Sequence, residues 1–372
     1  MNTKQIDEVL KNIDRQSILN KAKNATCEQV ATILNKSQIE VEDIPILLSD
    51  ASDSFLDVMA NRSQNISLQR FGRTIQLYVP LYLSNFCSNI CSYCGYAANH
   101  KINRRKISVA EAVKECQILS KQGFRNLLLV SGEDRKHITP EFLAEVAHAL
   151  KDNFPALSME TQPFESVAEY QTCVQAGIDG LTIYQETYDR KIYDQIHIKG
   201  RKKDFTNRLH CIDHGGKAGM RRLGIGILLG IADMIPDAYA LAIHGKYLQQ
   251  KHWKSVLSFS FPRMQPMGTD FEIKYPVSDK QLAKLICVFR LIFNDSPIVL
   301  STRESSDLRN TLLPCGVTQM SAGSSTEPGG YSEDSKAEKS GAQFDIGDQR
   351  SPSEMAKVIT DAGYEPVWKD WQ

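Results

Sequence analysis

Eight short apolar runs alternate with helical patterns along most of the chain, and this alternation restricts the fold more than any other feature. Such alternation is typical of parallel strands joined by right-handed crossovers. Eight units predict an α/β fold, a (β/α)8 barrel of the TIM type, with a doubly wound open sheet as the alternative. The predicted strands are residues 75–83, 126–130, 156–160, 180–184, 222–229, 255–261, 297–300 and 318–321, and the predicted helices 109–121, 140–151, 166–176, 205–214, 237–250, 278–293, 306–312 and 353–361.

The regions outside the alternation are predicted to be extensions of a barrel domain that spans residues 75–322. Residues 1–74 have no strand pattern and are predicted to be helical, with polar breaks near 35–38 and 62–65. We expect them to cap the bottom of the barrel or to pack outside it. Residues 323–372 are predicted to complete and cover the barrel mouth. The stretch 321–348 is rich in Gly, Ser, Glu and Asp, which indicates a loop over the mouth or a solvated linker.

Charge and hydropathy exclude two classes of function. The 372 residues hold 44 Lys and Arg against 44 Asp and Glu, a formal net charge of zero. This balance argues against nucleic-acid binding and against a polybasic membrane-surface protein. The amino-terminal stretch is polar and no apolar run approaches the roughly 20 residues of a membrane span, so we expect no membrane partner and a cytoplasmic location.

Three of the nine cysteines are crowded in one short segment, as Cys87, Cys91 and Cys94 with the spacing C-x3-C-x2-C. The other six are scattered and are expected to be buried apolar side chains. The three thiolates fit two kinds of metal site. Zinc would need a fourth ligand, for which His100 is available. A four-iron cluster held by three cysteines would leave one iron free for an external ligand, and the spacing alone does not decide between the two.

Further polar residues follow the predicted strands directly. In a barrel of this type the chemistry gathers at the carboxyl ends of the strands, so we expect these residues to share one site with the cysteine segment. They are Ser131, Gly132 and Glu133 after the second strand, Glu160 at the end of the third, Gln185 and Glu186 after the fourth, Pro262 and Arg263 after the sixth, and Ser301 and Arg303 after the seventh.

The cysteine motif, with Tyr93 just before its last cysteine, resembles the signature of the radical S-adenosylmethionine (radical SAM) superfamily. Longer stretches resemble 2-iminoacetate synthases, the tyrosine lyases of thiazole formation in thiamine biosynthesis. This resemblance covers nearly everything from about residue 75 to the end. The matching stretches are LYLSNFCSNICSYCGY, SGE (131–133), METQPF (159–164), YQETYDRKIY (184–193), GKAGMRRLGIGILLG (216–230), SFSFPR (258–263), LSTRESS (300–306), SAGSSTEPGGY (321–331) and EPVWKDW (365–371).

The resemblance implies a [4Fe-4S] cluster on Cys87, Cys91 and Cys94, whose fourth iron binds the amino and carboxylate groups of S-adenosyl-L-methionine. The implied contacts to that cofactor come from the backbone of Tyr93 and from the residues that follow the second strand. At that position Ser131 replaces the first glycine of the usual Gly-Gly-Glu motif. The predicted cofactor-binding residues are Tyr93, Ser131, Gly132, Glu133, Glu160, Glu186, Gly224 and Gly226.

Two pairs of these residues are also supported by their positions in the predicted strands, independently of the resemblance. Glu160 and Glu186 stand at strand ends, where they could accept hydrogen bonds from ribose hydroxyls or an ammonium group. Gly224 and Gly226 lie within an apolar strand and not at a strand-to-helix turn, which disfavours a dinucleotide-binding loop. Glycines in a strand permit the close approach of a ligand, here the adenosine part of the cofactor.

Arg303 is the strongest candidate for substrate binding. Its planar guanidinium can bind an α-carboxylate through two hydrogen bonds, and Ser301, two residues earlier on the same side of the strand, can add a hydroxyl. The resemblance supports this assignment, because related lyases carry Ser-x-Arg at the substrate carboxylate. Tyr96 is predicted to line the same pocket. The basic run 104–106 is interpreted as a solvated face.

The resemblance also implies an activity. The cofactor is reductively cleaved, the resulting radical takes a hydrogen atom from the amino group of L-tyrosine, and the Cα-Cβ bond breaks to give 2-iminoacetate (dehydroglycine) and p-cresol. The expected partners are thiazole synthase, which would receive the unstable product, and an external electron donor such as flavodoxin. The alternatives are the hydrogenase-maturation tyrosine lyase, which carries a further cysteine-rich carboxyl-terminal cluster domain, a tryptophan lyase, and a zinc-stabilised binding protein.

Overall fold

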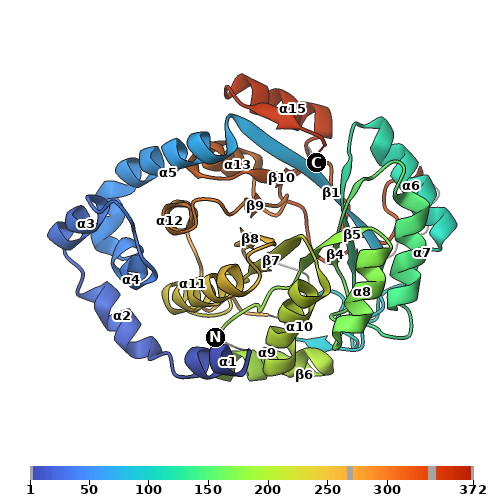
Figure 1. Cartoon of the computed structure of the whole chain (residues 1–372), viewed down its shortest axis with the longest axis horizontal. Coiled ribbons are helices and arrows are strands. Elements are labelled where there is room, and N and C mark those ends of the chain that lie inside the picture. Colours follow the sequence, from blue (N-terminus) through green and yellow to red (C-terminus); the bar gives the residue numbers. More distant parts are fainter. Residues whose placement is uncertain (1–2, 266–270, 334–340, 370–372) are drawn as a thin grey trace.

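The computed structural model contains the predicted eight-stranded parallel barrel (Figure 1). It describes residues 3–265, 271–333 and 341–369. Residues 334–340, part of the predicted 321–348 loop, lie outside the described residues, as do Asp370 and Trp371 of the carboxyl-terminal stretch. The barrel strands are β1 (Thr74–Ser84), β3 (Asn126–Ser131), β4 (Ala156–Glu160), β5 (Ile178–Thr182), β7 (Arg222–Gly226), β8 (Val256–Ser260), β9 (Ile298–Leu300) and β10 (Gln319–Ser321).

The barrel closes between its first and last strands. Each strand pairs in parallel with the next in chain order, and β10 returns to β1 with Gln76 opposite Gln319 and Tyr78 opposite Ser321. The structure therefore confirms the barrel and excludes the doubly wound open sheet. The helices on the outside of the barrel are α6 (Val109–Lys121), α7 (Pro140–Leu150), α8 (Val167–Gln175), α9 (Arg190–Ile196), α10 (Phe205–Ala218), α11 (Met234–Lys251), α12 (Asp279–Ile292), α13 (Ser306–Leu312) and α15 (Pro352–Asp361).

Four of these helices begin with the same local signal, a serine followed three residues later by Glu or Gln. The serine side chain accepts a hydrogen bond from the backbone of the third helical residue, whose own side chain bonds back to the serine backbone. This capping box satisfies backbone N–H groups that a helix start leaves without partners. The capping serines are Ser108, Ser166, Ser278 and Ser351.

The amino-terminal extension is helical and packs outside the barrel, as predicted. Figure 1 shows it curving round one side of the molecule, where its helices contact α10, α11 and α12. The predicted break at 35–38 follows α3, whereas the predicted break at 62–65 is wrong, because α5 runs through it. The helices are α1 (Thr3–Lys11), α2 (Arg15–Lys23), α3 (Cys27–Leu34), α4 (Ile44–Leu47) and α5 (Leu56–Phe71), with short 3-10 turns at Val41–Asp43 and Asp50–Phe55.

Three short strands have no counterpart in the sequence prediction. β2 (Ile90–Cys91) and β6 (His197–Lys199) pair with each other in an antiparallel two-stranded sheet. β11 (Glu365–Val367) pairs with the first residues of β1, Thr74–Gln76. Each has only two or three residues, too few for a repeating hydrophobic pattern. The domain boundaries at 74/75 and 322/323 stay a prediction.

Candidate active site

The cysteine segment lies at the carboxyl ends of the barrel strands, between β1 and α6. Cys87, Cys91 and Cys94 line one cavity, which we call the cysteine cavity and which encloses about 920 Å³. Two backbone contacts fix the segment to the barrel: Ser88 N–H donates to the Glu133 carbonyl at 2.9 Å, and Cys91 pairs with His197 across the small sheet. The three thiols therefore face a common space, as predicted.

Arg104 holds the two ends of the cysteine segment together through hydrogen bonds to its backbone. Its guanidinium donates hydrogen bonds to the backbone carbonyls of Asn85, Tyr96 and Ala97, at 2.5, 2.9 and 2.6 Å. The interpretation of the basic run as a solvated face is therefore wrong for Arg104. A guanidinium carries five N–H donors in a fixed fork, so it can bind several converging carbonyls at once.

The chemistry of the three thiols suits a cluster better than a zinc ion. Burial raises the pKa of Cys87 to about 11 and also raises the pKa of Cys91 and Cys94, although Lys202 opposes the shift at the last two. Thiolates at such sites need a metal to hold their charge. Within the described ranges no three His, Cys, Asp or Glu side chains converge on one point as a single metal ion requires, whereas the thiolates of a four-iron cluster bind different irons.

Gly132 lets the cysteine segment pack closely against the end of β3. A Cβ atom at this position would lie 2.3 Å from the Phe86 carbonyl oxygen and 3.1 Å from Cβ of Cys87. Any larger residue would therefore push the cysteine segment away from the strand end. Ser131 donates its hydroxyl hydrogen bond to the Gly132 carbonyl at 2.9 Å, so its side chain is engaged locally while its backbone lines the cavity wall.

Four charged side chains form a network in the wall of the cysteine cavity. Arg208 Nη1 donates to Glu133 Oε1 at 2.6 Å, and Lys202 Nζ donates to Glu186 Oε1 at 2.6 Å. Asn89, from the cysteine segment, donates to Glu133 Oε2 at 2.8 Å and accepts from the Lys202 N–H at 3.0 Å. Burial favours the neutral form of Glu133, but Arg208 and Lys202 outweigh it and hold its pKa below the ordinary value. The network joins the cysteine segment to β3, α10 and the turn after β6.

Glu186 has a strained backbone. Its φ is +70°, and among the described residues it alone of the non-glycine residues has a positive φ. Such a conformation costs of order 1–3 kcal/mol and persists only where the surroundings enforce it. Here the Lys202 ion pair and a 2.8 Å hydrogen bond from Leu228 N–H to the Glu186 carbonyl hold the residue. Glu186 lines the cysteine cavity in this conformation, and its cofactor-binding role stays a prediction.

The Tyr93 side chain is fixed by a buried histidine. The Tyr93 hydroxyl lies 3.0 Å from His197 Nε2, and His197 Nδ1 lies 2.9 Å from the Tyr193 carbonyl oxygen. A carbonyl can only accept, so Nδ1 carries the hydrogen and Nε2 accepts from the tyrosine. Burial, with Lys202 and Arg208 adding to it, lowers the pKa of His197 to about 2, so the ring is neutral. The side chain of Tyr93 is thus packed behind the cysteine segment.

Glu160 lies where the cysteine cavity meets a second cavity of about 530 Å³, which we call the arginine cavity. Among the described residues its carboxylate has no hydrogen bond or ion pair. Burial and the nearby charge of Glu186 raise the pKa of Glu160 to about 7, although Arg303 and Lys202 partly oppose the shift. Because this half-buried carboxylate has no bonding partner among the described residues, it is available to bind a ligand.

Arg303 and Ser301 both line the arginine cavity. The Arg303 guanidinium stacks on Phe344, with Cζ 3.5 Å from the ring centroid, and forms no ion pair within the described ranges. The neighbouring Glu304 is not the partner of Arg303, since its buried carboxylate binds Arg263 instead. Arg303 is therefore free to bind a carboxylate at the junction of the two cavities.

The carboxyl-terminal extension covers this junction. Phe344 and Gln343 line both cavities, and the Gln343 side chain accepts a 2.7 Å hydrogen bond from the Tyr82 hydroxyl. Gln343 N–H and the Phe344 carbonyl bind Thr326. Tyr96, which is fully buried, donates its hydroxyl to the Thr326 carbonyl at 2.5 Å. The ring of Tyr96 therefore lines the cysteine cavity while its hydroxyl holds the cover in place.

Gly224 and Gly226 do not lie where the sequence predicted. Neither lines the cysteine cavity or the arginine cavity. A Cβ on Gly224 would lie 2.6 Å from Thr182 Oγ1, and one on Gly226 would lie 2.4 Å from the Ser260 carbonyl oxygen. Both glycines therefore make room for the neighbouring strands β5 and β8, and their role in binding the cofactor stays a prediction.

Several residues of the site were missed at the level of sequence. Lys202 and Arg208 follow β6, a strand too short to be predicted. Lys202 lies in a basic stretch, GRKKDF, that resembles an exposed loop, and Arg208 lies in the first turn and a half of α10. Asn89 lies inside the cysteine segment and Phe344 in the glycine-rich extension. A signal for Arg208 does exist, because it lies three and four residues from Phe205, Cys211 and Ile212 on the buried face of α10.

The comparisons with known proteins agree with this geometry. The model of the radical SAM superfamily matches residues 81–238, and the model of the biotin and thiamin synthesis associated domain matches residues 260–365. A 2-iminoacetate synthase from Escherichia coli is 38% identical over 96% of this chain and 94% of its own length. One from Salmonella typhimurium is 39% identical over 93% and 91%. The chain belongs to the 2-iminoacetate synthase family.

Two solved barrel structures superpose on most of this radical SAM enzyme. A crystal structure of HydG, a maturase of the [FeFe]-hydrogenase, superposes with a TM-score of 0.89 at 30% identity, over 96% of this chain and 80% of that one. The methylornithine synthase PylB superposes with a TM-score of 0.71 at 22% identity, which shows the fold alone. As in the superfamily, the cofactors are a [4Fe-4S] cluster and S-adenosylmethionine. None of the described helices is both long and apolar enough to cross a membrane.

Proposed function

We propose that this chain cleaves the Cα-Cβ bond of L-tyrosine, giving 2-iminoacetate and p-cresol. The observation that carries the proposal is the position of Arg303, an available guanidinium at the junction between the arginine cavity and the cysteine cavity. An amino acid whose carboxylate is bound there would hold its amino group close to the cysteine cavity. The activity of the 2-iminoacetate synthases at 38% and 39% identity supports the same reaction.

The chain's own residues bind, orient and exclude water. When bound, the cluster and S-adenosylmethionine supply a 5′-deoxyadenosyl radical that removes a hydrogen atom from the substrate. Cys87, Cys91 and Cys94 would hold the cluster. Ser301 and Arg303 would bind the substrate carboxylate. This binding would hold the substrate in a fixed orientation relative to the radical. The cover formed by the carboxyl-terminal extension would keep water from the reactive products.

The carboxylates of the cysteine cavity would bind the cofactor. Glu133, kept ionised by Arg208, can accept a hydrogen bond from an ammonium group. Glu160 and Glu186 can accept from hydroxyl groups, and Gly132 and Ser131 offer backbone groups beside them. Tyr93 would contribute its backbone and Tyr96 the apolar surface of its ring. Each assignment is part of the proposal.

The proposed reaction implies two protein partners. 2-Iminoacetate reacts with water to give glyoxylate and ammonia, so a thiazole synthase that consumes it directly is the proposed recipient. Reductive cleavage of S-adenosylmethionine requires an electron, for which an external donor such as flavodoxin is proposed. Both reactions belong to the cytoplasm, which we propose as the location.

The test is an anaerobic assay of the reconstituted enzyme with S-adenosylmethionine, a reductant and L-tyrosine. We expect p-cresol and 5′-deoxyadenosine to appear together. Formation of 5′-deoxyadenosine without p-cresol would reject tyrosine as the substrate. A parallel reaction with L-tryptophan tests the sister lyase activity, because a product from tryptophan and none from tyrosine would replace the proposal.

A further inference from the structure

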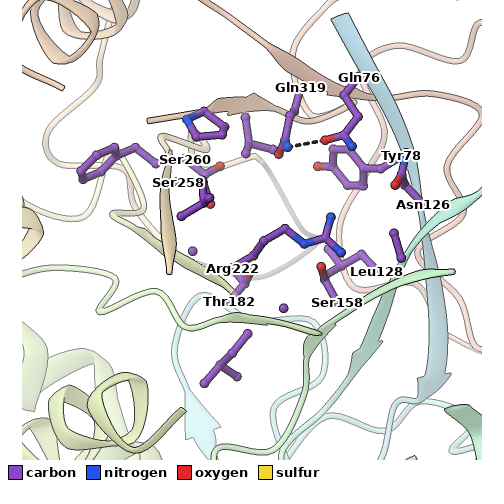
Figure 2. A pocket seen from close by; sticks show the side chains of 18 of the residues that line it. Gln76, Tyr78, Asn126, Leu128, Ser158, Thr182, Arg222, Ser258, Ser260 and Gln319 are labelled. Atoms are coloured by element: carbon purple, nitrogen blue, oxygen red, sulfur yellow. Dashed lines mark hydrogen bonds between the residues drawn. The ribbon is translucent and has the colours of Figure 1, made fainter. Parts of the chain in front are cut away.

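The barrel encloses a third cavity that the proposed reaction does not use. It lies inside the sheet, and its empty volume, counted together with the space that opens to solvent, is about 720 Å³. Figure 2 shows polar side chains from opposite sides of the barrel directed into it. We call it the inner chamber, and its polar lining includes Gln76, Ser158, Thr182, Arg222, Ser258 and Gln319. A barrel of this fold is ordinarily filled by layers of bulky branched side chains, so an open interior with an arginine and several other polar side chains among its lining calls for an explanation.

The inner chamber adjoins the site. Tyr78, Leu128, Tyr184 and Ser260 line both the inner chamber and the arginine cavity. Only this layer of side chains separates the proposed position of the substrate from the interior of the barrel. On the other side, above the arginine cavity, lies the cover that contains Phe344. The chamber therefore lies directly behind the arginine cavity, one layer of side chains away from the proposed substrate position.

One buried polar atom in the chamber lacks a partner. Asn126 is 4% exposed, and its Nδ2 donates to the carbonyls of Leu77 and Trp368 at 3.2 and 3.1 Å. Within the described part of the chain, its Oδ1 has no hydrogen-bond partner. Buried polar atoms are nearly always bonded, and leaving one unbonded destabilises the folded state. Asn126 Oδ1 thus offers an acceptor for an N–H or O–H group in the chamber.

The chamber has a single charged side chain in its described lining, Arg222. Its Nη2 donates to Asp179 Oδ1 at 2.5 Å, which holds the guanidinium in place. Asp179 itself lines a different cavity, at the lower mouth of the barrel. Figure 2 shows the Arg222 side chain reaching across the chamber. Together with the hydroxyls of Ser158 and Ser258, it supplies donors suited to a small carboxylate.

We propose that the inner chamber is a second binding site, which takes the two-carbon imino acid product. The proposal rests on the proposed function, because that reaction is what makes the imino acid. The carboxylate of the product would meet the donors of Arg222 and the serines, and its N–H would meet Asn126 Oδ1. The phenolic product, with one hydroxyl, would leave most of this polar lining without partners. Holding the imino acid in the chamber delays its hydrolysis.

Direct binding tests the chamber without turnover. The probe is radiolabelled glycine, which has the same carbon skeleton, a carboxylate and N–H donors, in equilibrium dialysis against the anaerobic holoenzyme. We expect binding to weaken at least tenfold in Arg222→Met and in Ser158→Leu, which fills the chamber. The matched control is Arg221→Met, which removes an exposed arginine beside the lower mouth and should leave binding unchanged.

A further variant separates the two possible carboxylate sites. Arg303→Met removes the guanidinium of the arginine cavity, and glycine binding should survive it. Loss of binding in Arg303→Met but not in Arg222→Met or Ser158→Leu would place glycine in the arginine cavity and overturn the proposal. Absence of glycine binding to the wild-type holoenzyme would also overturn it.

Single-turnover kinetics test the role in product retention. In wild type we expect glyoxylate, the hydrolysis product, to appear later than p-cresol. In Ser158→Leu the delay should shorten at least threefold while p-cresol formation is unchanged. Equal delays in the two proteins would contradict the chamber. Absence of p-cresol from the wild-type reaction would instead contradict the proposed function, and the glycine measurements would still decide whether the chamber binds the imino acid class.

Discussion

Arg208 donates a 2.6 Å hydrogen bond to Glu133, and both side chains are buried in the wall of the cysteine cavity. The pair joins α10 to the end of β3. The backbone carbonyl of Glu133 in turn binds the N–H and the hydroxyl of Ser88, in the cysteine segment. One ion pair therefore connects an outer helix to the segment that carries the three cysteines.

Replacing Arg208 should lower the free energy of unfolding. Arg208→Met leaves the Glu133 carboxylate buried without its cation, and breaking a buried pair in this way costs about 3–5 kcal/mol. The free energy of unfolding in urea measures the loss. The control is Arg135→Met, whose ion pair with Glu169 is on the surface and should contribute no more than about 1 kcal/mol. Equal losses in the two variants would show that the buried pair has no special role.

The three clustered cysteines should determine the iron content. Replacing Cys87, Cys91 or Cys94 singly by alanine should abolish stable binding of iron and sulfide after anaerobic reconstitution, because each supplies a ligand that the others cannot replace. Cys116→Ala, a change at a buried cysteine in α6, should leave the iron content unchanged. Stoichiometric zinc in the anaerobically prepared wild-type protein would instead support the zinc-binding alternative.

Replacing Arg303 should affect the binding of tyrosine. Hydrogen bonds to a charged group contribute about 1.5–3 kcal/mol, so Arg303→Met should raise KM by about 10-fold to 150-fold. Arg303→Lys should recover part of this, since lysine keeps the charge and loses the two-pronged geometry. Steady-state kinetics with varied tyrosine give both values. An unchanged KM in Arg303→Met would remove Arg303 from the substrate site.

Glu160 should make stability depend on pH. Its pKa of about 7 in the folded chain lies above the unfolded value of about 4.3, so the folded state binds the proton more tightly. The stabilisation is complete below the unfolded pKa and is lost as the pH rises through 7. Relative to Glu160→Gln, the wild type should therefore lose about 1–3 kcal/mol of unfolding free energy between pH 4 and pH 8. A difference independent of pH would contradict the assignment.

The features that could be predicted from the sequence are the strands and the residues at their ends, because both depend on the local hydrophobic pattern. Periodicity located all eight barrel strands, and the strand ends then brought Glu133, Glu160, Glu186 and Arg303 to one mouth, because parallel strands end on the same side. The prediction for Gly224 and Gly226 is less well founded, because a glycine in a strand has two explanations. A strand position can require glycine because a neighbouring strand packs against it or because a ligand approaches it. The sequence shows a glycine in both cases.

The residues that the sequence did not predict depend on contacts between distant segments. Lys202 and Arg208 meet the cysteine segment only because β6 pairs with β2, and two strands this short carry no pattern. Phe344 reaches Arg303 from the carboxyl-terminal extension, whose composition suits a cover and a linker equally well. The inner chamber is still less visible, since its polar lining is spread one or two residues at a time over the barrel strands.

The central claim is that the guanidinium of Arg303 presents tyrosine to a radical made beside the three cysteines. The most direct measurement is the ratio of p-cresol to 5′-deoxyadenosine in a single anaerobic turnover, for wild type and for Arg303→Met. We predict near-equal amounts in wild type and, in Arg303→Met with subsaturating tyrosine, 5′-deoxyadenosine with little p-cresol. The same ratio in both proteins, or no p-cresol in either, would contradict the account.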